Sequence, residues 1–135
     1  MAARSKARKR ALDLIYASEM RHRSALEALA EQTESGAAHN DYTVRLVEGI
    51  TAHRARIDEV IASYAQGWTM ERMPAIDRNV LRLATFEVLY VDEVPYAVAV
   101  SEALKLVRDL STDDSPGFVN GVLGNIVRDR NSLIA

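Results

Sequence analysis

The sequence predicts an all-α protein of about seven helices in a compact bundle. Apolar residues recur at i, i+3, i+4 and i+7 over most of the chain, which is the period of a helix with one buried face. No segment shows the alternation of apolar and polar residues that is typical of a half-buried strand. Ser or Pro precedes several of the periodic segments, at positions where helices begin. No repeat or linker divides the 135 residues, so we expect residues 1–135 to form a single domain.

The composition is that of an ordinary globular protein, with 27% charged and 48% hydrophobic residues. The absence of cysteine excludes disulfides, thiolate metal sites and cysteine nucleophiles. No apolar run approaches the roughly 20 residues that cross a bilayer, and the basic first residues lead into an amphipathic segment rather than the core of a secretion signal. We therefore expect a cytoplasmic protein without a membrane partner.

Charge is distributed unevenly along the chain. The first 23 residues carry seven Lys or Arg against Asp13 and Glu19, a balance of +5, so the remaining residues carry −7 of the net charge of −2. A chain polarised in this way can attract a polyanion at one end and stay soluble as a whole.

Residues 4–21 are predicted to form the first helix. Arg4 and Arg8 border its core-facing side, whereas Lys6 and Arg10 lie further round, towards solvent. The small and apolar residues that can dock on a core share one face: Ala7, Ala11, Leu14, Ile15 and Ser18.

The basic residues of this helix, together with Tyr16, indicate contact with nucleic acid. Five cations fall between Arg4 and Arg10, which is more than solubility requires. Lys9 and Tyr16 stand at i and i+7, so the phenol lies beside the cationic surface. Cations neutralise phosphates, and an aromatic ring can stack on an unpaired base. The alternative is a solvated helix in which Tyr16 closes the core.

Two further helical segments follow. Ser24 and Glu27 form a capping box, which starts a short second helix. Asn40 or Asp41 opens a longer segment with helical period. That segment is either one rod of about 25 residues or two helices broken near residues 51–53, and two helices have the more usual length.

Pro74 begins the helix that we expect at the centre, because residues 76–91 leave almost no polar face. Just before it, Thr69 is the expected cap of a helical start, with the indole of Trp68 packed on later apolar residues. The polar exceptions on the central helix are expected to reach solvent, a salt bridge or a partner: Asp77, Arg78 and Arg82.

The last two helices flank a polar loop at residues 111–115. Pro95 begins the first of them, while Ser115 is expected to cap the second, with Pro116 at its first position. Three glycines share one side of the final helix: Gly117, Gly121 and Gly124. Each lowers the stability of the helix by about 1 kcal/mol relative to alanine. Internal helix packing explains them most simply, and a protein or polymer partner is the alternative. The tail from Arg128 onward carries no informative pattern.

The sequence contains no constellation of catalytic or metal-binding residues. The three histidines are isolated: His22, His39 and His53. Phosphate-binding glycine loops and a nucleophile elbow are absent. Asp113 and Asp114 are adjacent carboxylates before a helix, where capping and the helix dipole explain them better than acid–base chemistry. We expect no enzyme activity, no cofactor and no metal.

Three segments occur in the order and spacing of a known protein family. Residues 113–124 have the sequence DDSPGFVNGVLG. Residues 11–16 read ALDLIY, and DEVPY at 92–96 leads to SEA at 101–103. Together these segments resemble the NusB family of bacterial transcription antitermination factors, and the resemblance covers nearly the whole chain.

The resemblance implies a small helical factor of two packed three-helix-like halves, without catalysis or cofactor. Such factors bind single-stranded boxA RNA of ribosomal RNA operons together with the ribosomal protein NusE. Through other Nus factors they act on RNA polymerase and suppress premature termination. The free protein is either a monomer or a homodimer.

The resemblance also implies roles for individual residues. The arginine-rich motif of the family corresponds to Arg4, Lys6, Arg8, Lys9 and Arg10, and its RNA-binding tyrosine to Tyr16. Asp114, Ser115 and Phe118 match positions near the RNA path, and Glu71 and Asp77 match acidic positions that face the ribosomal protein. Ser5 departs from the pattern, since relatives often carry arginine there.

The residues themselves leave the role of Phe118 open, since its ring either completes the core or stacks on a base. Asp114 cannot attract phosphate, so beside RNA it would bond base edges or discriminate between them.

Two other functions remain to be distinguished. One is the NusB-like amino-terminal domain of an RNA methyltransferase, but no Rossmann segment follows within the 135 residues. The other is a NusB-like helical interaction module, whose basic helix serves dimerisation or protein binding rather than RNA.

Overall fold

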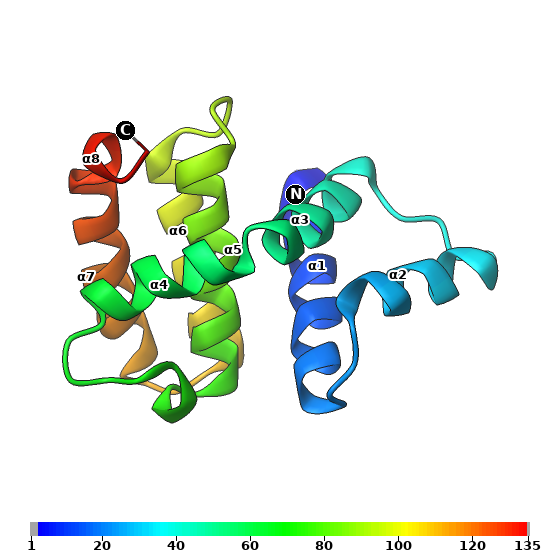
Figure 1. Cartoon of the computed structure of the whole chain (residues 1–135), viewed down its shortest axis with the longest axis horizontal. Helices are drawn as coiled ribbons and strands as arrows, with labels where there is room; N and C mark the ends of the chain where they lie inside the picture. Colours follow the sequence, from blue (N-terminus) through cyan, green and yellow to red (C-terminus); the bar gives the residue numbers. More distant parts are fainter. Residues whose placement is uncertain (1–2, 135) are drawn as a thin grey trace. The chain divides into compact units, whose positions relative to one another are not determined.

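The structure, a computed structural model, describes residues 3–134. Within these residues there are eight α-helices and one 3₁₀ turn, and no strand (Figure 1): α1 (Ala3–Met20), α2 (Ala25–Glu34), α3 (Asp41–Ala52), α4 (Arg54–Tyr64), η1 (Met70–Arg72), α5 (Ala75–Tyr90), α6 (Tyr96–Leu110), α7 (Ser115–Arg128) and α8 (Arg130–Ile134). The prediction of an all-α fold is confirmed. The chain forms two compact units, the first ending at Ala52 and the second beginning at His53.

In the first unit, helices α1, α2 and α3 pack on one another. The predicted core face of α1 is buried, and it meets the apolar residues of α3. Thr43 ties the two helices together, because its buried hydroxyl donates to the carbonyl of Ala7 at 3.1 Å. Ser24 caps α2 as predicted, since its Oγ accepts from the amides of Leu26 and Glu27 at 3.2 and 3.4 Å.

The long segment that begins at Asp41 forms two helices, as expected from the usual length of helices. Helix α3 ends at Ala52 and α4 begins at Arg54, with His53 between them at φ −109° and ψ 16°. The alternative of a single rod is therefore wrong.

The second unit is built around α5, against which α4, α6, α7 and α8 pack. Twelve of its 16 residues are buried, so the prediction of a helix buried all round is confirmed. Its apolar residues supply much of the core of this unit, with the apolar stripe of α7 contributing Val119, Val122, Leu123 and Ile126.

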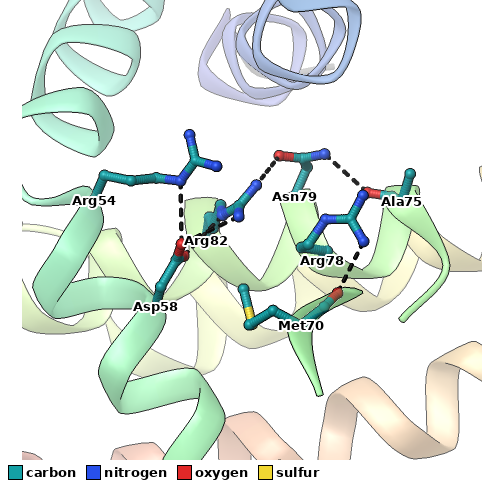
Figure 2. Close-up of polar contacts among 7 residues, drawn as sticks. All are labelled: Arg54, Asp58, Met70, Ala75, Arg78, Asn79 and Arg82. Carbon is teal, nitrogen blue, oxygen red and sulfur yellow. Dashed lines mark hydrogen bonds and ion pairs between the residues drawn. The ribbon is translucent and has the colours of Figure 1, made fainter. Parts of the chain in front are cut away.

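Three polar residues of α5, Arg78, Asn79 and Arg82, bond to other residues of the second unit (Figure 2). Arg82 is 4% exposed and donates to both carboxylate oxygens of Asp58 on α4, at 2.8 and 3.1 Å. A third bond joins Arg82 to the side chain of Asn79 at 3.0 Å, and Asn79 in turn donates to the carbonyl of Ala75. Arg78 donates to the carbonyl of Met70 at 2.9 Å, which holds η1 against α5. Of the three outcomes expected for Arg82, the structure shows a salt bridge.

The carboxyl-terminal residues make several contacts with the rest of the second unit. Arg130 on α8 donates to the carbonyl of Val88 at 2.7 Å and to Asp92 at 3.1 Å, and its guanidinium lies 5.3 Å from the Tyr96 ring. The tail, whose sequence carries no informative pattern, is thus held to the end of α5 by Arg130, and Arg56 on α4 also donates to the carbonyl of Leu133 at 3.0 Å.

Asp129, which follows α7, links that helix to α4. The Tyr64 hydroxyl donates to Asp129 at 2.7 Å, and Arg128 pairs with the same carboxylate at 2.9 Å. The bond from Arg128, followed by that from Tyr64, lowers the pKa of Asp129 from 3.8 to about 2. The same hydrogen bond raises the pKa of Tyr64 above its usual value.

Removing the carboxylate of Asp58 should destabilise the second unit strongly. Asp58→Ala leaves the guanidinium of Arg82 buried without its charge partner, at an expected loss of about 3 kcal/mol in the free energy of unfolding. Urea denaturation followed by circular dichroism measures this loss.

Glu59→Ala is the matched control, because Glu59 pairs with Arg56 on the same helix at an exposed site. Its loss should stay below about 1 kcal/mol. Equal losses for the two variants would show that the burial of Arg82 does not matter.

Candidate nucleic-acid interface

The predicted basic motif of α1 divides into three groups in space. Arg4 and Arg8 approach the ring of Tyr42 on α3, with guanidinium carbons 4.4 and 5.6 Å from its centroid. Arg8 is only 3% exposed, so it lies on the core-facing side of the helix. RNA contact by Arg8 stays a prediction, and it requires the guanidinium to leave this position.

Lys9 and Tyr16 form the second group. The ammonium of Lys9 is paired with Asp13, one turn along, at 2.7 and 2.9 Å. Both side chains are about half exposed, at 45% and 53%, so the pair contributes little stability and a phosphate can compete for the lysine. Tyr16 is half-buried, so the residue stays partly at the surface.

Lys6 and Arg10 form the third group. Both side chains are exposed. Neither side chain makes a hydrogen bond or an ion pair with any other residue between 3 and 134. They are therefore the cations of the motif that are most available to an anion.

In the second predicted RNA segment, Ser115 is 1% exposed. Its hydroxyl accepts from the amide of Thr112 at 3.2 Å and donates to the hydroxyl of Ser111 at 3.0 Å. Ser111 in turn donates to the buried carboxylate of Asp77 at 2.6 Å. These bonds tie the loop before α7 to the first turn of α5.

The expectation that Ser115 caps the final helix is wrong. Helix α7 starts at Ser115 itself, and the cap position belongs to Asp114, whose side chain makes no cap hydrogen bond. The hydroxyl of Ser115 faces back to the loop because Thr112 and Ser111 offer it partners there. The Asp114 carboxylate is exposed.

Phe118 is half-buried, one turn after Ser115. Its ring centroid lies 6.0 Å from that of Trp68, with the planes tilted by 57°. Trp68 is 49% exposed. Thr69 occupies the cap position of η1, as predicted, but its side chain makes no cap hydrogen bond. The indole packs beside Phe118, a contact that the sequence did not reveal because 50 residues separate the two.

The glycine side of α7 is open. A Cβ added at Gly117, Gly121 or Gly124 would meet nothing within 4 Å in the described structure. Internal helix packing against these glycines, the simpler of the two explanations, is therefore not what the structure shows.

The two acidic residues predicted to face a protein partner occupy different environments. Glu71 lies on η1 and is exposed. Asp77 is 2% exposed and accepts from Ser111, so it does not reach solvent. Its position in the first turn of α5 also suits the helix dipole.

Within residues 3–134, His, Asp and Glu side chains form no group of three that could hold a metal ion. None of the helices in this part of the chain has the length and apolarity of a bilayer-crossing segment.

Comparison with known proteins identifies the family. The model of the NusB family matches residues 5–128. The chain belongs to the NusB family. It is 60% identical to a transcription antitermination protein NusB from Nocardioides sp., over 98% of this chain and 99% of the relative. It is 55% identical to the protein of that name from Salinispora arenicola, over 93% and 96% of the two chains.

Solved structures of the family have the same fold. A crystal structure of T. maritima NusB superposes with a TM-score of 0.86 at 28% identity, covering 96% of this chain and 93% of the other. A chain from a crystal structure of the antitermination factors NusB and NusE in complex with double-stranded RNA gives a TM-score of 0.80 at 26% identity. It covers 93% of this chain and 96% of the other.

The buried position of Asp77 predicts a structural role that Glu71 lacks. Asp77→Ala removes the acceptor of the Ser111 hydroxyl and should lower the free energy of unfolding by about 1–3 kcal/mol. Glu71→Ala, at an exposed site nearby in the chain, should change it by less than about 0.5 kcal/mol. Chemical denaturation of both variants measures the difference, and full stability of the Asp77 variant would refute the role.

Proposed function

We propose that this chain is a non-catalytic transcription antitermination factor that binds single-stranded boxA RNA of ribosomal RNA operons together with the ribosomal protein NusE. It suppresses premature termination through other Nus factors and RNA polymerase, in the cytoplasm where the nascent transcript is made. The observation that carries this proposal is similarity over nearly the whole chain to NusB proteins, including one in a complex with NusE and RNA.

The RNA-binding residues of the proposal come from both units. In α1 they are Arg4, Lys6, Arg8, Lys9, Arg10 and Tyr16; around the start of α7 they are Asp114, Ser115 and Phe118. Lys6 and Arg10 support it most directly, because exposed cations without an internal partner can neutralise phosphates at no cost in internal bonds. On binding RNA, Lys9 leaves its ion pair with Asp13 and pairs with a phosphate instead.

The residues at the start of α7 serve base recognition rather than charge neutralisation. The exposed carboxylate of Asp114 accepts hydrogen bonds from base edges and disfavours bases that offer only acceptors. Phe118, supported by the exposed indole of Trp68, offers an aromatic surface for an unpaired base. Ser115, being buried, positions Asp114 through its bonds to the loop.

Glu71 is the residue that we propose for contact with NusE. Its carboxylate is exposed on η1, a short turn held to α5 by Arg78. Asp77 supports the partner surface indirectly, because its own carboxylate is used inside the second unit. No step of this function requires a catalytic group, a cofactor or a metal.

Salt dependence tests the RNA-binding function. If about four phosphates are neutralised, the logarithm of the binding constant for a boxA RNA should fall with the logarithm of salt concentration at a slope near −3. The double variant Lys6→Glu with Arg10→Glu should weaken binding by at least about 100-fold, while helicity and NusE binding persist. Fluorescence anisotropy measures both.

Arg108→Glu is the control, because Arg108 is an exposed arginine on α6, outside the proposed interface. Its RNA affinity should stay within about twofold of the unmodified chain. Binding without salt dependence, or an equal loss in the control, would contradict the proposal. Light scattering with and without RNA measures the oligomeric state. A dimer that RNA neither binds nor dissociates would instead favour a dimerisation module.

A further inference from the structure

Two cavities in the first unit lie on either side of Arg10. The first, of about 260 Å³, lies where α1 meets the residues that open α3, and Lys6, Arg10, His39, Asn40 and Thr43 supply its polar lining. The second, of about 270 Å³, lies between α1 and α2. Its polar lining consists of Arg10, Asp13, Ser18, Arg21, Arg23 and Gln32. Arg10 is the residue that the two cavities share.

Cations without internal partners dominate both linings. The side chains of Lys6, Arg10 and Arg21 make no hydrogen bond or ion pair with other residues of the described chain. The two remaining charges in the second cavity are already compensated, since Arg23 pairs with Glu31 at 2.7 Å and Asp13 pairs with Lys9. Each cavity therefore presents an excess of positive charge.

Unsatisfied polar atoms gather at the same two places. Among the described residues, four buried side-chain atoms lack a hydrogen-bond partner, and three of them belong to residues that line these cavities. They are the Oγ of Ser18, which is 5% exposed, and both ring nitrogens of His39. Leaving a buried polar atom without a partner is unfavourable, so these atoms call for a ligand or an ordered water.

The cations follow a single line along α1. Lys6 and Arg10 lie on α1, and Arg21 follows its last residue, Met20. The amide of Arg21 still donates to the carbonyl of Ala17 at 3.0 Å, so the helical path reaches Arg21, and the spacing of i, i+4 and i+15 places the three within about 60° of one another around the axis. The small side chain of Ala17 lies between the last two and lines the second cavity. At 1.5 Å per residue this line spans about 22 Å, the length of several nucleotides. Lys9 and Tyr16 project about 60° or more to one side of it.

We propose that the two cavities bind phosphodiester groups of one nucleic-acid strand, which lies along the line from Lys6 to Arg21 with Arg10 between the two phosphates. The inference rests on the proposed RNA-binding function and adds three residues to it: Ser18, Arg21 and His39. The cavities are lined by ammonium, guanidinium and imidazole groups, which are hydrogen-bond donors. The oxygens of a phosphodiester can accept from several such donors at once. In the first cavity the imidazole of His39 turns to donate to the phosphate.

A repeating polyanion fits this surface better than an acidic protein segment. Two cavities of similar volume share one arginine, which suits two phosphates of one strand held on either side of it. Neither lining contains an aromatic ring other than the imidazole of His39, so the bases point away from the cavities and leave them to the backbone. Contacts outside the two cavities then supply sequence preference, whereas the cations from Lys6 to Arg21 supply affinity and orient the strand.

Substitution at Arg21 tests the inference, because that residue lies outside the basic motif. With a fluorescein-labelled single-stranded boxA RNA and the full chain, Arg21→Gln should weaken binding about three- to tenfold and reduce the salt slope by about 0.7. Arg108→Gln is the matched control and should leave both unchanged, since Arg108 is exposed on α6.

A second substitution removes the imidazole. His39→Ala should weaken binding about threefold, whereas His22→Asn, at an exposed turn with φ 54°, should not. Thermal melting of each variant separates loss of binding from loss of folding. A mononucleotide should bind far more weakly than the strand, because it occupies one cavity without the linked second contact.

The outcomes separate this inference from the function on which it rests. If the Arg21 and His39 variants bind like the unmodified chain while Lys6→Glu with Arg10→Glu abolishes binding, the function stands and the cavities are not the phosphate sites. If the unmodified chain binds no RNA, both fail. Equal competition by a polyglutamate peptide of the same charge would overturn the choice of a nucleic-acid strand.

Discussion

The buried ion pair between Arg82 and Asp58 is the constraint on which the second unit depends. Helix α5 is surrounded by other helices, so the charged side chains that it buries need partners inside, since a buried unpaired charge costs several kcal/mol. Arg82 meets this condition through α4, and Arg78 does so through η1. Asp77 meets it through Ser111 and thereby orders the loop that presents Asp114 and Phe118. The polar partners of the central helix thus position the residues proposed for base recognition.

In the first unit, the helical period of α1 separates two uses of positive charge. Arg8 is buried on the core-facing side and Arg4 is exposed at its edge, and both guanidinium groups lie over the ring of Tyr42, where a cation contributes to packing. Lys6, Arg10 and Arg21 fall on the opposite side, beside cavities with unsatisfied polar atoms. A motif that is uniform in sequence therefore serves both stability and binding.

Sequence patterns predicted the helices well, because apolar period, caps and prolines are local signals. The cap at Ser24, the break at His53 and the burial of α5 all followed from them. What they could not predict depends on contacts between distant residues. Local sequence favoured Ser115 as a cap, yet its hydroxyl bonds back to Ser111 and Thr112. The cavities beside Arg10 likewise require three helices to meet, which no spacing along the chain reveals.

Mapping the RNA onto the chain by nuclear magnetic resonance tests the central claim most directly. Titration of an isotope-labelled full chain with single-stranded boxA RNA should shift backbone amides along α1, from Lys6 to Arg21, and around Asp114 and Phe118. Amides of α6, such as that of Arg108, should stay unchanged. Shifts confined to α6 and α8, or none at RNA concentrations that saturate a NusB protein, would contradict the account.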